Sequence, residues 1–298
     1  VASFNRAEQS YTLYVASQNP HVERLLMTAF VLGLPETKVR VIAPDVGGGF
    51  GSKIFLYAEE TALVWASKRV NRPIKWTAER SESFLTDAHG RDHHTKVELA
   101  MDAKGNFLAM RVDTIANMGA YLSTFASSVP TILYATLLAG QYKTPAIYCN
   151  VKAVFTTTAP VDAYRGAGRP EATYAIERLM DELAAEVGVD PIAIREKNWI
   201  TKDEFPFTTV AGMTYDSGNY EAATAKALEL FGYDDLRAEQ QRRREAGDTV
   251  QLGIGVSTFT EMCGLAPSRV LGSLSYGAGG WESASIRMLA TGTVEVVS

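Results

Sequence analysis

The stretch VGGGFGSK, residues 46–53, crowds glycine into one short segment: it contains Gly47, Gly48, Gly49 and Gly51. Glycine costs backbone entropy on folding, but its missing β-carbon lets another segment or a ligand approach the main chain. The stretch follows an alternating segment at 38–43, which predicts a strand, and it precedes a helical pattern at 56–68. We therefore predict a strand-to-helix loop whose backbone is in close contact with another group.

The loop fits neither of two familiar phosphate-binding patterns. A P-loop needs Gly-Lys-Ser/Thr, whereas the order here is Gly51-Ser52-Lys53. A dinucleotide fingerprint needs a third glycine where Ser52 stands, and no acidic residue ends a strand about 20 positions later. Two readings of the loop alone stay open: an anion-binding nest at a helix start, or a turn that lets two segments cross closely. A nucleotide-binding enzyme would need the first of these.

Composition limits the class of protein. The chain has 298 residues, 46% of them hydrophobic and 21% charged, which is typical of a globular protein with a substantial core. The net charge of −5 argues against nucleic acid or an anionic membrane as the main partner. Cys149 and Cys263 are isolated, so we expect no disulfide scaffold and a cytoplasmic location. No apolar run reaches the roughly 18 residues of a membrane span.

Helical and strand patterns interleave along the chain without a regular βαβ rhythm. Helices are predicted over residues 19–33, 56–68, 171–187, 190–200, 220–231 and 236–246. Strands are predicted over residues 11–17, 38–43, 72–78, 150–158, 251–263 and 283–298, with a hairpin over 94–119. These patterns predict an α+β fold with mixed sheets, antiparallel hairpins and packed helices. A polar, aperiodic stretch near 202–207 predicts a domain boundary between residues 1–204 and 205–298. Because the sequence begins at Val1 and stops inside a strand-like segment, we expect a piece of a longer polypeptide.

A second motif, AYRGAGRPEA at residues 163–172, ends a predicted strand and opens the strongest predicted helix. It carries Arg165 and Arg169 around two glycines. The arginine fork pairs bidentately with anions, and a glycine turn lets a ligand approach. An arginine near a helix start can equally form a surface ion pair, so the motif alone leaves both readings open.

Taken together, four motifs resemble a known family. ASQNP (16–20), VGGGFGSK (46–53), AYRGAGRPEA (163–172) and IREKNWI (194–200) occur in this order over essentially the whole chain. They resemble the molybdenum-cofactor-binding large subunit of the xanthine oxidase, aldehyde oxidase and aerobic carbon monoxide dehydrogenase family. The resemblance implies a molybdopterin-binding fold of the aldehyde oxidase type, with residues 1–204 as the first such domain and 205–298 as the start of a second.

The resemblance also implies a function and partners. The implied reaction is the oxidative hydroxylation of an aldehyde or N-heterocycle with water, and the cofactor is molybdopterin carrying molybdenum, in the family often as its cytosine dinucleotide. Electrons would pass to iron–sulfur and FAD centres on partner subunits, in a dimer of heterotrimers. This chain has no cysteine set for a cluster. A rival hypothesis is a non-catalytic scaffold or assembly piece that keeps the fold and binds no cofactor.

Family roles transfer to individual residues. Gln18 matches the glutamine that hydrogen-bonds a metal oxo group, and Phe50 and Gly51 match positions whose backbone lies against the metal centre. Arg165 matches the catalytic arginine beside the substrate, which can stabilise developing negative charge. The full set of cofactor-binding positions is Gln18, Gly48, Gly49, Phe50 and Gly51. In this pattern no protein residue ligates the metal.

Two substrate-pocket positions depart from the family pattern. Ile54 stands where purine-hydroxylating relatives have a glutamate, and an apolar side chain cannot hydrogen-bond a purine. Gly166 stands where carbon monoxide dehydrogenases have a copper-bearing cysteine, and without a thiolate there is no soft ligand for Cu(I). The resemblance therefore argues against purines and carbon monoxide as substrates. The family's glutamate base does not fall within these 298 residues, so we expect the fragment alone to be inactive.

Overall fold

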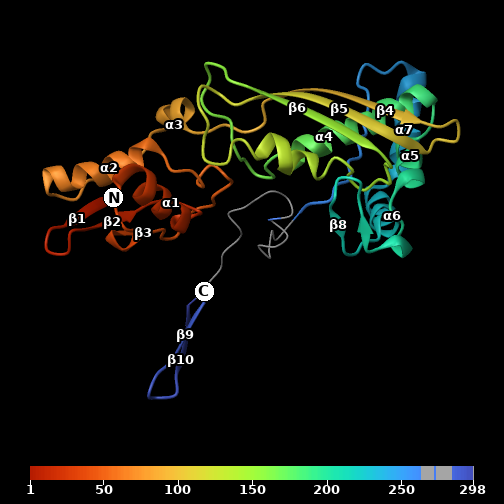
Figure 1. Cartoon of the computed structure of the whole chain (residues 1–298). Coiled ribbons are helices and arrows are strands. Elements are labelled where there is room, and N and C mark those ends of the chain that lie inside the picture. Colours follow the sequence, from red (N-terminus) through yellow and green to blue (C-terminus); the bar gives the residue numbers. More distant parts are fainter. Residues whose placement is uncertain (263–271, 273–283, 298) are drawn as a thin grey trace. The chain divides into compact units, whose positions relative to one another are not determined.

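A computed structural model describes residues 1–262, 272 and 284–297, which divide into two compact units, Val1–Phe259 and Thr260–Ser298 (Figure 1). The first unit contains helices on mixed sheets, so the predicted α+β class is confirmed. In the second unit, β9 (Ser285–Met288) and β10 (Val294–Val297) form an antiparallel hairpin, so the strand predicted over residues 283–298 is present as two short strands. Position 263 of the predicted strand 251–263 lies outside the described residues.

The N-terminal part of the first unit is built on a small three-stranded sheet. Its elements are β1 (Ala2–Asn5), β2 (Ser10–Tyr14), α1 (Pro20–Leu26), the π-helical η1 (Met27–Leu32), the 3₁₀ turn η2 (Glu36–Lys38), β3 (Val39–Ile42) and α2 (Ala58–Val70). β1 and β2 pair antiparallel, whereas β2 and β3 pair parallel, because α1 and η1 carry the chain back across the sheet. Gly33, at φ 62°, ends this helical crossover as expected. Leu13 of β2, Met27 of η1 and Val64 of α2 belong to one apolar cluster, which joins the helices to the sheet.

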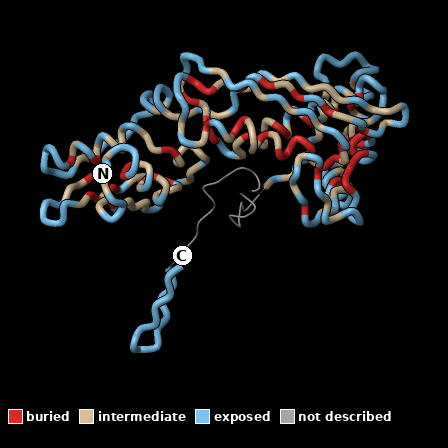
Figure 2. The backbone as a smooth tube through the Cα atoms, in the orientation of Figure 1, coloured by how far each residue is buried: buried red, intermediate tan, exposed pale blue. Residues whose placement is uncertain are grey.

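The central sheet follows the predicted hairpin closely. Its elements are α3 (Arg80–Thr86), β4 (His93–Met101), β5 (Phe107–Asn117), the π-helical η3 (Val129–Leu133), β6 (Ile147–Val154) and α4 (Arg169–Val187). β4 and β5 pair antiparallel across a turn in which Asp102 Oδ1 accepts the N–H groups of Lys104 and Asn106, both at 2.9 Å. β6 adds parallel to β5. The long helix α4 lies along this sheet, and many buried residues lie where the helix and the sheet face each other (Figures 1 and 2).

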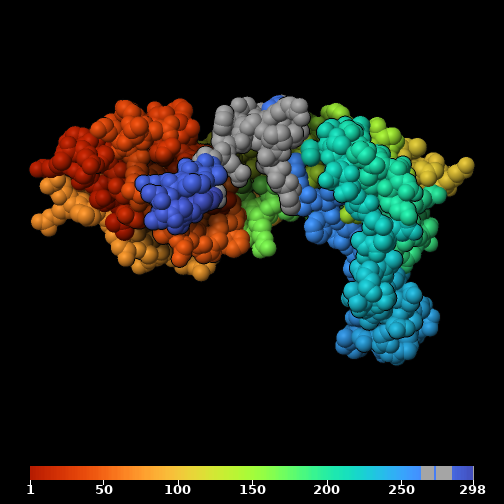
Figure 3. Space-filling model, turned by 90° about the horizontal axis from the view of Figure 1, so that it is seen from below, coloured from red at the N-terminus to blue at the C-terminus, as the bar shows by residue number. Residues whose placement is uncertain are grey.

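The rest of the first unit is largely helical. It consists of α5 (Pro191–Asn198), η4 (Lys202–Glu204), the short pair β7 (Phe207–Thr208) and β8 (Thr214–Tyr215), α6 (Tyr220–Phe231) and α7 (Tyr233–Ala246). Asp190 caps α5 by accepting the Ile192 N–H at 2.7 Å, the cap that the sequence predicts. In the space-filling view the surface of α6 and α7 projects from the unit (Figure 3). Contacts continue across position 204, for example Tyr215 Oη donating to Gly140 O at 2.9 Å. The boundary at 204/205 therefore does not divide the compact units, and it stays a prediction about domain identity.

A buried ion network joins α4, α5 and the segment after α7. Arg195 is fully buried, and its guanidinium pairs with Glu177 at 3.0 Å and with Asp181 at 2.9 Å. It also donates to Val256 O at 3.1 Å, while Glu177 Oε2 accepts the Thr258 N–H at 2.9 Å. Both charges are thus compensated by partners inside the fold, which a buried ion pair requires.

Two strand predictions are wrong. Residues 72–78 contribute only an isolated bridge, in which Ile74 exchanges both backbone hydrogen bonds with Ala2 at 2.9 Å. The described residues 251–262 contain no strand, although their side chains alternate in exposure. Their backbone groups bond instead to side chains such as those of Arg195 and Glu177. Alternating polar and apolar residues indicate an extended, half-buried segment. Such a segment forms a strand only where its backbone groups bond to the backbone of a neighbouring strand.

Candidate functional site

Three segments that are distant in sequence meet at one surface, which we call the three-segment wall: Gln18, the glycine loop 46–53 and the turn 163–168. Gln18 donates its N–H to Lys53 O at 3.0 Å, and its side-chain Oε1 accepts the Gly51 N–H at 2.9 Å. Arg165 donates its N–H to Phe50 O at 2.9 Å. The structure therefore brings together the residues that the family resemblance selects, through hydrogen bonds that involve main-chain groups.

The glycines are needed because the protein's own segments come this close. A β-carbon on Gly51, at φ 86°, would lie 2.5 Å from Ala163 O. On Gly49 it would lie 2.2 Å from Gln18 Oε1, and on Gly48 it would lie 2.3 Å from the Phe50 ring. A β-carbon on Gly47 would meet nothing within 4 Å. The close crossing that the loop predicts is thus present at Gly49 and Gly51, whereas Gly48 makes room for the Phe50 ring of the same loop.

Phe50 is held in an unusual conformation at the centre of the wall. Its φ of 56° is left-handed, which costs a non-glycine residue about 1–2 kcal/mol. Its ring is 50% exposed, so burial does not compensate this cost fully. Backbone strain of this kind clusters at ligand-binding and catalytic sites. Among hydrogen bonds between described residues none uses the Phe50 N–H, whereas the Gly51 N–H is already donated to Gln18.

Arg165 presents an exposed cation beside this ring. Its guanidinium carbon lies 5.9 Å from the centroid of Phe50, within cation–π range. Within the part of the chain that the structure describes, its side chain makes neither an ion pair nor a hydrogen bond. The main chain of Arg165 is therefore fixed by a hydrogen bond, whereas its guanidinium has only the Phe50 ring as a partner among the described residues.

The two predicted substrate-pocket positions have different surroundings. Ile54 is half-buried and packs on an apolar cluster that includes Phe55 and Ala163. Gly166 has φ 100°, and a β-carbon there would lie 2.3 Å from Pro170 Cγ. The turn geometry therefore requires glycine at 166, independently of any ligand.

Two residues that support the wall carry no sequence signal. Asp162 is only 1% exposed, and its oxygens accept the N–H groups of Phe125 at 2.9 Å and Ala163 at 2.6 Å. Burial raises the pKa of this carboxyl. Arg91 donates to Arg165 O and lies 5.0 Å from the Tyr164 ring centroid. Both stand in polar loops, where a charged residue ordinarily indicates solvent exposure.

Two neighbouring carboxyls, the buried Glu23 and the half-buried Glu60, interact through their charges. Glu23 on α1 is 1% exposed, and neither of its oxygens makes a hydrogen bond of normal geometry with a described residue. Burial raises its pKa from 4.5 to about 7, an effect that Ser17 partly offsets. Burial and the charge of Glu23 raise the pKa of Glu60, on α2, to about 8. These two groups therefore change charge close to neutral pH.

The described residues offer no alternative metal or membrane site. No group of three or more His, Cys, Asp or Glu side chains gathers among them in a metal-binding arrangement. Within the same residues, no helix combines the length and apolarity needed to cross a bilayer.

Comparisons with known proteins show the family to which the chain belongs. A family model described as the molybdopterin cofactor-binding domain matches residues 1–199. The carbon monoxide dehydrogenase large chain of Hydrogenophaga pseudoflava is 41% identical over 98% of this chain and 36% of its own length. The nicotine 6-hydroxylase large subunit of Paenarthrobacter nicotinovorans is 31% identical over 100% of this chain and 36% of its own length. The crystal structure of quinoline 2-oxidoreductase from Pseudomonas putida 86 matches with a TM-score of 0.91 and 33% identity, over 99% of this chain and 37% of that one. The chain spans little more than a third of these relatives, and it belongs to the molybdopterin cofactor-binding domain family.

Proposed function

We propose that this chain supplies one wall of the molybdenum-cofactor pocket in the catalytic subunit of a molybdenum hydroxylase. The observation that carries the proposal is the convergence of Gln18, Phe50–Gly51 and Arg165 on one surface through two hydrogen bonds, Gly51 N–H to Gln18 Oε1 and Arg165 N–H to Phe50 O. When bound, the cofactor would supply the redox chemistry and the oxygen transfer from water. The chain itself supplies binding, orientation and electrostatics.

The residues present fit such a group. Because Oε1 of Gln18 is occupied by the Gly51 N–H, its amide nitrogen is left to donate outward. The Phe50 N–H, which no described residue accepts, is a second donor on the same wall. Two donors suit an oxygen-rich anionic group: the Gly51 N–H orients the Gln18 amide, and the left-handed φ of Phe50 sets the direction of its own N–H. Gly51 contributes by orienting Gln18 rather than by donating to the cofactor.

Arg165 is proposed as the catalytic cation. Its main chain is held against the loop, and no described residue forms an ion pair with its guanidinium, so it can approach a substrate on which negative charge develops. A preoriented cation of this kind stabilises the transition state more than the ground state, which is the requirement for a gain in kcat.

The substrate proposed is an aldehyde or an N-heterocycle. Ile54 offers no hydrogen bond to a purine. At Gly166 a cysteine side chain would collide with Pro170, which argues against the copper-bearing thiolate of carbon monoxide dehydrogenases despite the overall similarity. The relatives named for nicotine and quinoline, both N-heterocycles, support the second class.

The complete protein is proposed to work with partners. Electrons would leave to iron–sulfur and FAD subunits in a cytoplasmic dimer of heterotrimers, with the cofactor in its molybdopterin or cytosine dinucleotide form. The relatives are named as large chains or large subunits, which supports additional subunits. The family match over residues 1–199 ends near position 204 and supports a second molybdopterin-binding domain from residue 205 onward.

Arg165→Ala and Gln18→Ala in the complete enzyme test the proposal. We expect kcat to fall about 100- to 1,000-fold for Arg165→Ala, as for loss of one transition-state donor, while folding is unchanged. Arg111→Ala, at an exposed position on β5, is the control. Wild-type turnover in both variants would contradict the roles proposed for Gln18 and Arg165, whereas a complete wild-type subunit that contains neither molybdenum nor pterin would favour the scaffold alternative.

A further inference from the structure

The loop between α3 and β4 reaches the back of the three-segment wall through Arg91. We propose that Arg91 is a positioning residue for Arg165: it holds the Tyr164–Arg165 main chain so that the Arg165 guanidinium stays beside Phe50. The inference rests on the proposed function, which gives Arg165 its catalytic role, and adds a residue to which the family match assigns nothing.

Both main-chain polar groups of Arg165 are hydrogen-bonded. Its N–H is donated to Phe50 O at 2.9 Å, and its carbonyl accepts the hydrogen bond of Arg91 Nη2. The guanidinium carbon of Arg91 also lies 5.0 Å from the ring centroid of Tyr164, the preceding residue. The Arg91 side chain thus contacts both Tyr164 and Arg165. Removal of this side chain would leave the Arg165 carbonyl free to rotate.

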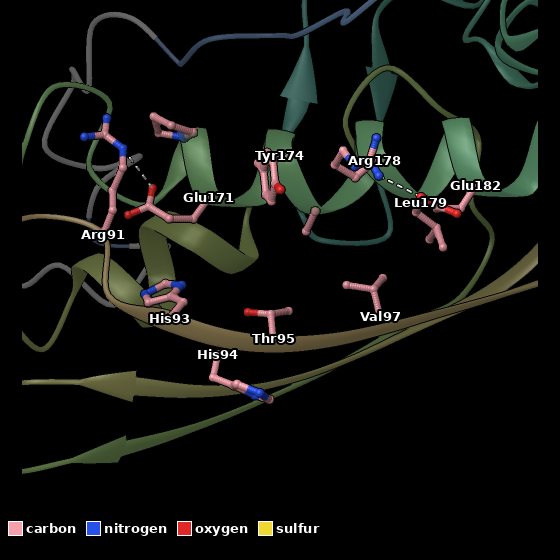
Figure 4. A pocket seen from close by; sticks show the side chains of 12 residues that line it. Arg91, His93, His94, Thr95, Val97, Glu171, Tyr174, Arg178, Leu179 and Glu182 are labelled. Carbon is pink, nitrogen blue, oxygen red and sulfur yellow. Dashed lines mark hydrogen bonds and ion pairs between the residues drawn. The ribbon is translucent and has the colours of Figure 1, made fainter. Parts of the chain in front are cut away.

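A neighbouring carboxylate orients Arg91. Glu171 Oε2 lies 4.0 Å from Arg91 Nε, and the Glu171 side chain is only 10% exposed. This oxygen has no hydrogen bond to a described residue, so Arg91 is the cation nearest to satisfying it. Figure 4 shows the two side chains approaching from the loop before β4 and from α4. Glu171 stands in the first turn of α4, where a negative charge is favoured by the helix dipole.

The backbone of the loop is shaped for the same contact. Arg91 has a left-handed φ of 61°, and a β-carbon on Gly90 would lie 2.5 Å from Tyr164 Cβ. The preceding residue, His89, donates its N–H to Pro160 O at 2.8 Å and accepts the Asp162 N–H at 2.7 Å. The loop is therefore tied to the chain just before the turn, and a conformation unfavourable for arginine is maintained there.

The contact requires arginine specifically. A planar guanidinium can donate to the Arg165 carbonyl, face the Tyr164 ring and approach Glu171 at the same time, whereas a lysine ammonium is a single compact charge. In the complete enzyme we expect Arg91→Met to lower kcat about 10- to 100-fold, with little change in KM, since a small misplacement of a catalytic group has this effect. Arg91→Lys should restore part of the loss.

The test is a double-mutant cycle with hydrogen exchange as a second readout. If Arg91 acts through Arg165, Arg91→Met should lower kcat less than about threefold in an Arg165→Ala background. Hydrogen exchange of the backbone amides should become faster in residues 163–168 and stay unchanged in the β4–β5 hairpin. Arg178 lines the same pocket between β4 and α4 as Arg91 but pairs with Glu182 at 2.7 Å, so Arg178→Met is the matched control and should change neither readout. If Arg91→Met fails to assemble, the cycle is run with Arg91→Lys.

The outcomes separate the two proposals. An equal loss of kcat with and without Arg165, or unchanged exchange in residues 163–168, would overturn the positioning role and leave the proposed function intact. Wild-type turnover for Arg165→Ala alone would remove the catalytic role of Arg165, and the positioning role of Arg91 with it.

Discussion

Arg195 and Arg165 show two opposite ways of using an arginine in one fold. Arg195 is fully buried, and Glu177, Asp181 and the Val256 carbonyl take up its donors. Arg165 is exposed, and no described residue pairs with its guanidinium. A charge whose partners all lie inside the protein stabilises the fold only as part of a complete network. A charge held in place without a partner is suited to a ligand.

The two regions also differ in what holds them. Side chains build the Arg195 network, in which carboxylates on α4 meet a guanidinium on α5. Main-chain groups build the three-segment wall, where Gly51 and Arg165 donate their N–H groups and glycines remove the β-carbons between them. The comparison predicts that substitutions in the network damage stability, whereas substitutions in the wall damage cofactor binding and turnover.

The largest effect on stability is expected for Arg195→Met. Removal of the cation leaves Glu177 buried without its main partner, which costs about 3–5 kcal/mol in the free energy of unfolding. The midpoint of urea unfolding of the complete subunit measures this loss. Arg242→Met removes a surface pair with Glu239 on α7 and should leave the midpoint almost unchanged. Equal midpoints for the two variants would contradict the contrast between buried and exposed arginines.

Gly51→Ala tests whether the wall depends on close main-chain approach. The new β-carbon would lie 2.5 Å from Ala163 O at a φ of 86°, which we expect to cost about 2–4 kcal/mol and to separate the loop from the turn. Molybdenum content of the complete enzyme should fall with it. Gly47→Ala is matched in chemistry and meets nothing within 4 Å, so it should retain the metal. Loss of metal in both variants would indicate general damage to the loop.

Glu23 predicts a smaller, pH-dependent effect. Its folded pKa of about 7 is above the unfolded value of 4.5, so the unfolded chain ionises first and stability is lost as the pH rises from about 4.5 through 7. Glu60, with a pKa of about 8, extends this loss upward. Glu23→Gln should therefore stabilise the protein at pH 8 by about 1–2 kcal/mol and have little effect at pH 5.

Unfolding midpoints at the two pH values measure the effect. Glu186→Gln, on the exposed face near the end of α4, should not depend on pH in this way. An unchanged or lowered midpoint for Glu23→Gln at pH 8 would show that the Glu23 carboxylate is accommodated in the folded protein.

Much of the fold could be predicted from sequence because local signals agree with packing. Pro20, Asp190 and Gly188 mark helix ends that the structure confirms, and the Asp102 turn joins the two longest strands. The segment 251–262 was wrongly predicted as a strand, since its alternation reflects contact with Glu177 and Arg195 rather than with a neighbouring strand. Such partners lie far away in sequence and leave no local trace.

In the candidate site, too, some residues could be identified from the sequence and others could not. Its glycines and Arg165 belong to recognisable motifs, and the loop's need for close contact follows from glycine chemistry alone. The sequence could not identify Asp162 and Arg91 as supporting residues, because their roles depend on which backbone groups the fold places beside them. The family resemblance places the backbone of both Phe50 and Gly51 against the metal centre, whereas in the structure the Gly51 N–H is donated to Gln18, a contact that only the fold reveals.

The central claim is that the three-segment wall faces a molybdenum cofactor. Its most direct test is the molybdenum and pterin content of the complete subunit, purified from a cofactor-competent host, by metal analysis and by fluorescence after oxidation. We predict close to one molybdenum and one pterin per chain in the wild type and in Arg165→Ala, and a clear loss of both in Gly51→Ala. A complete wild-type subunit that contains neither would contradict the account.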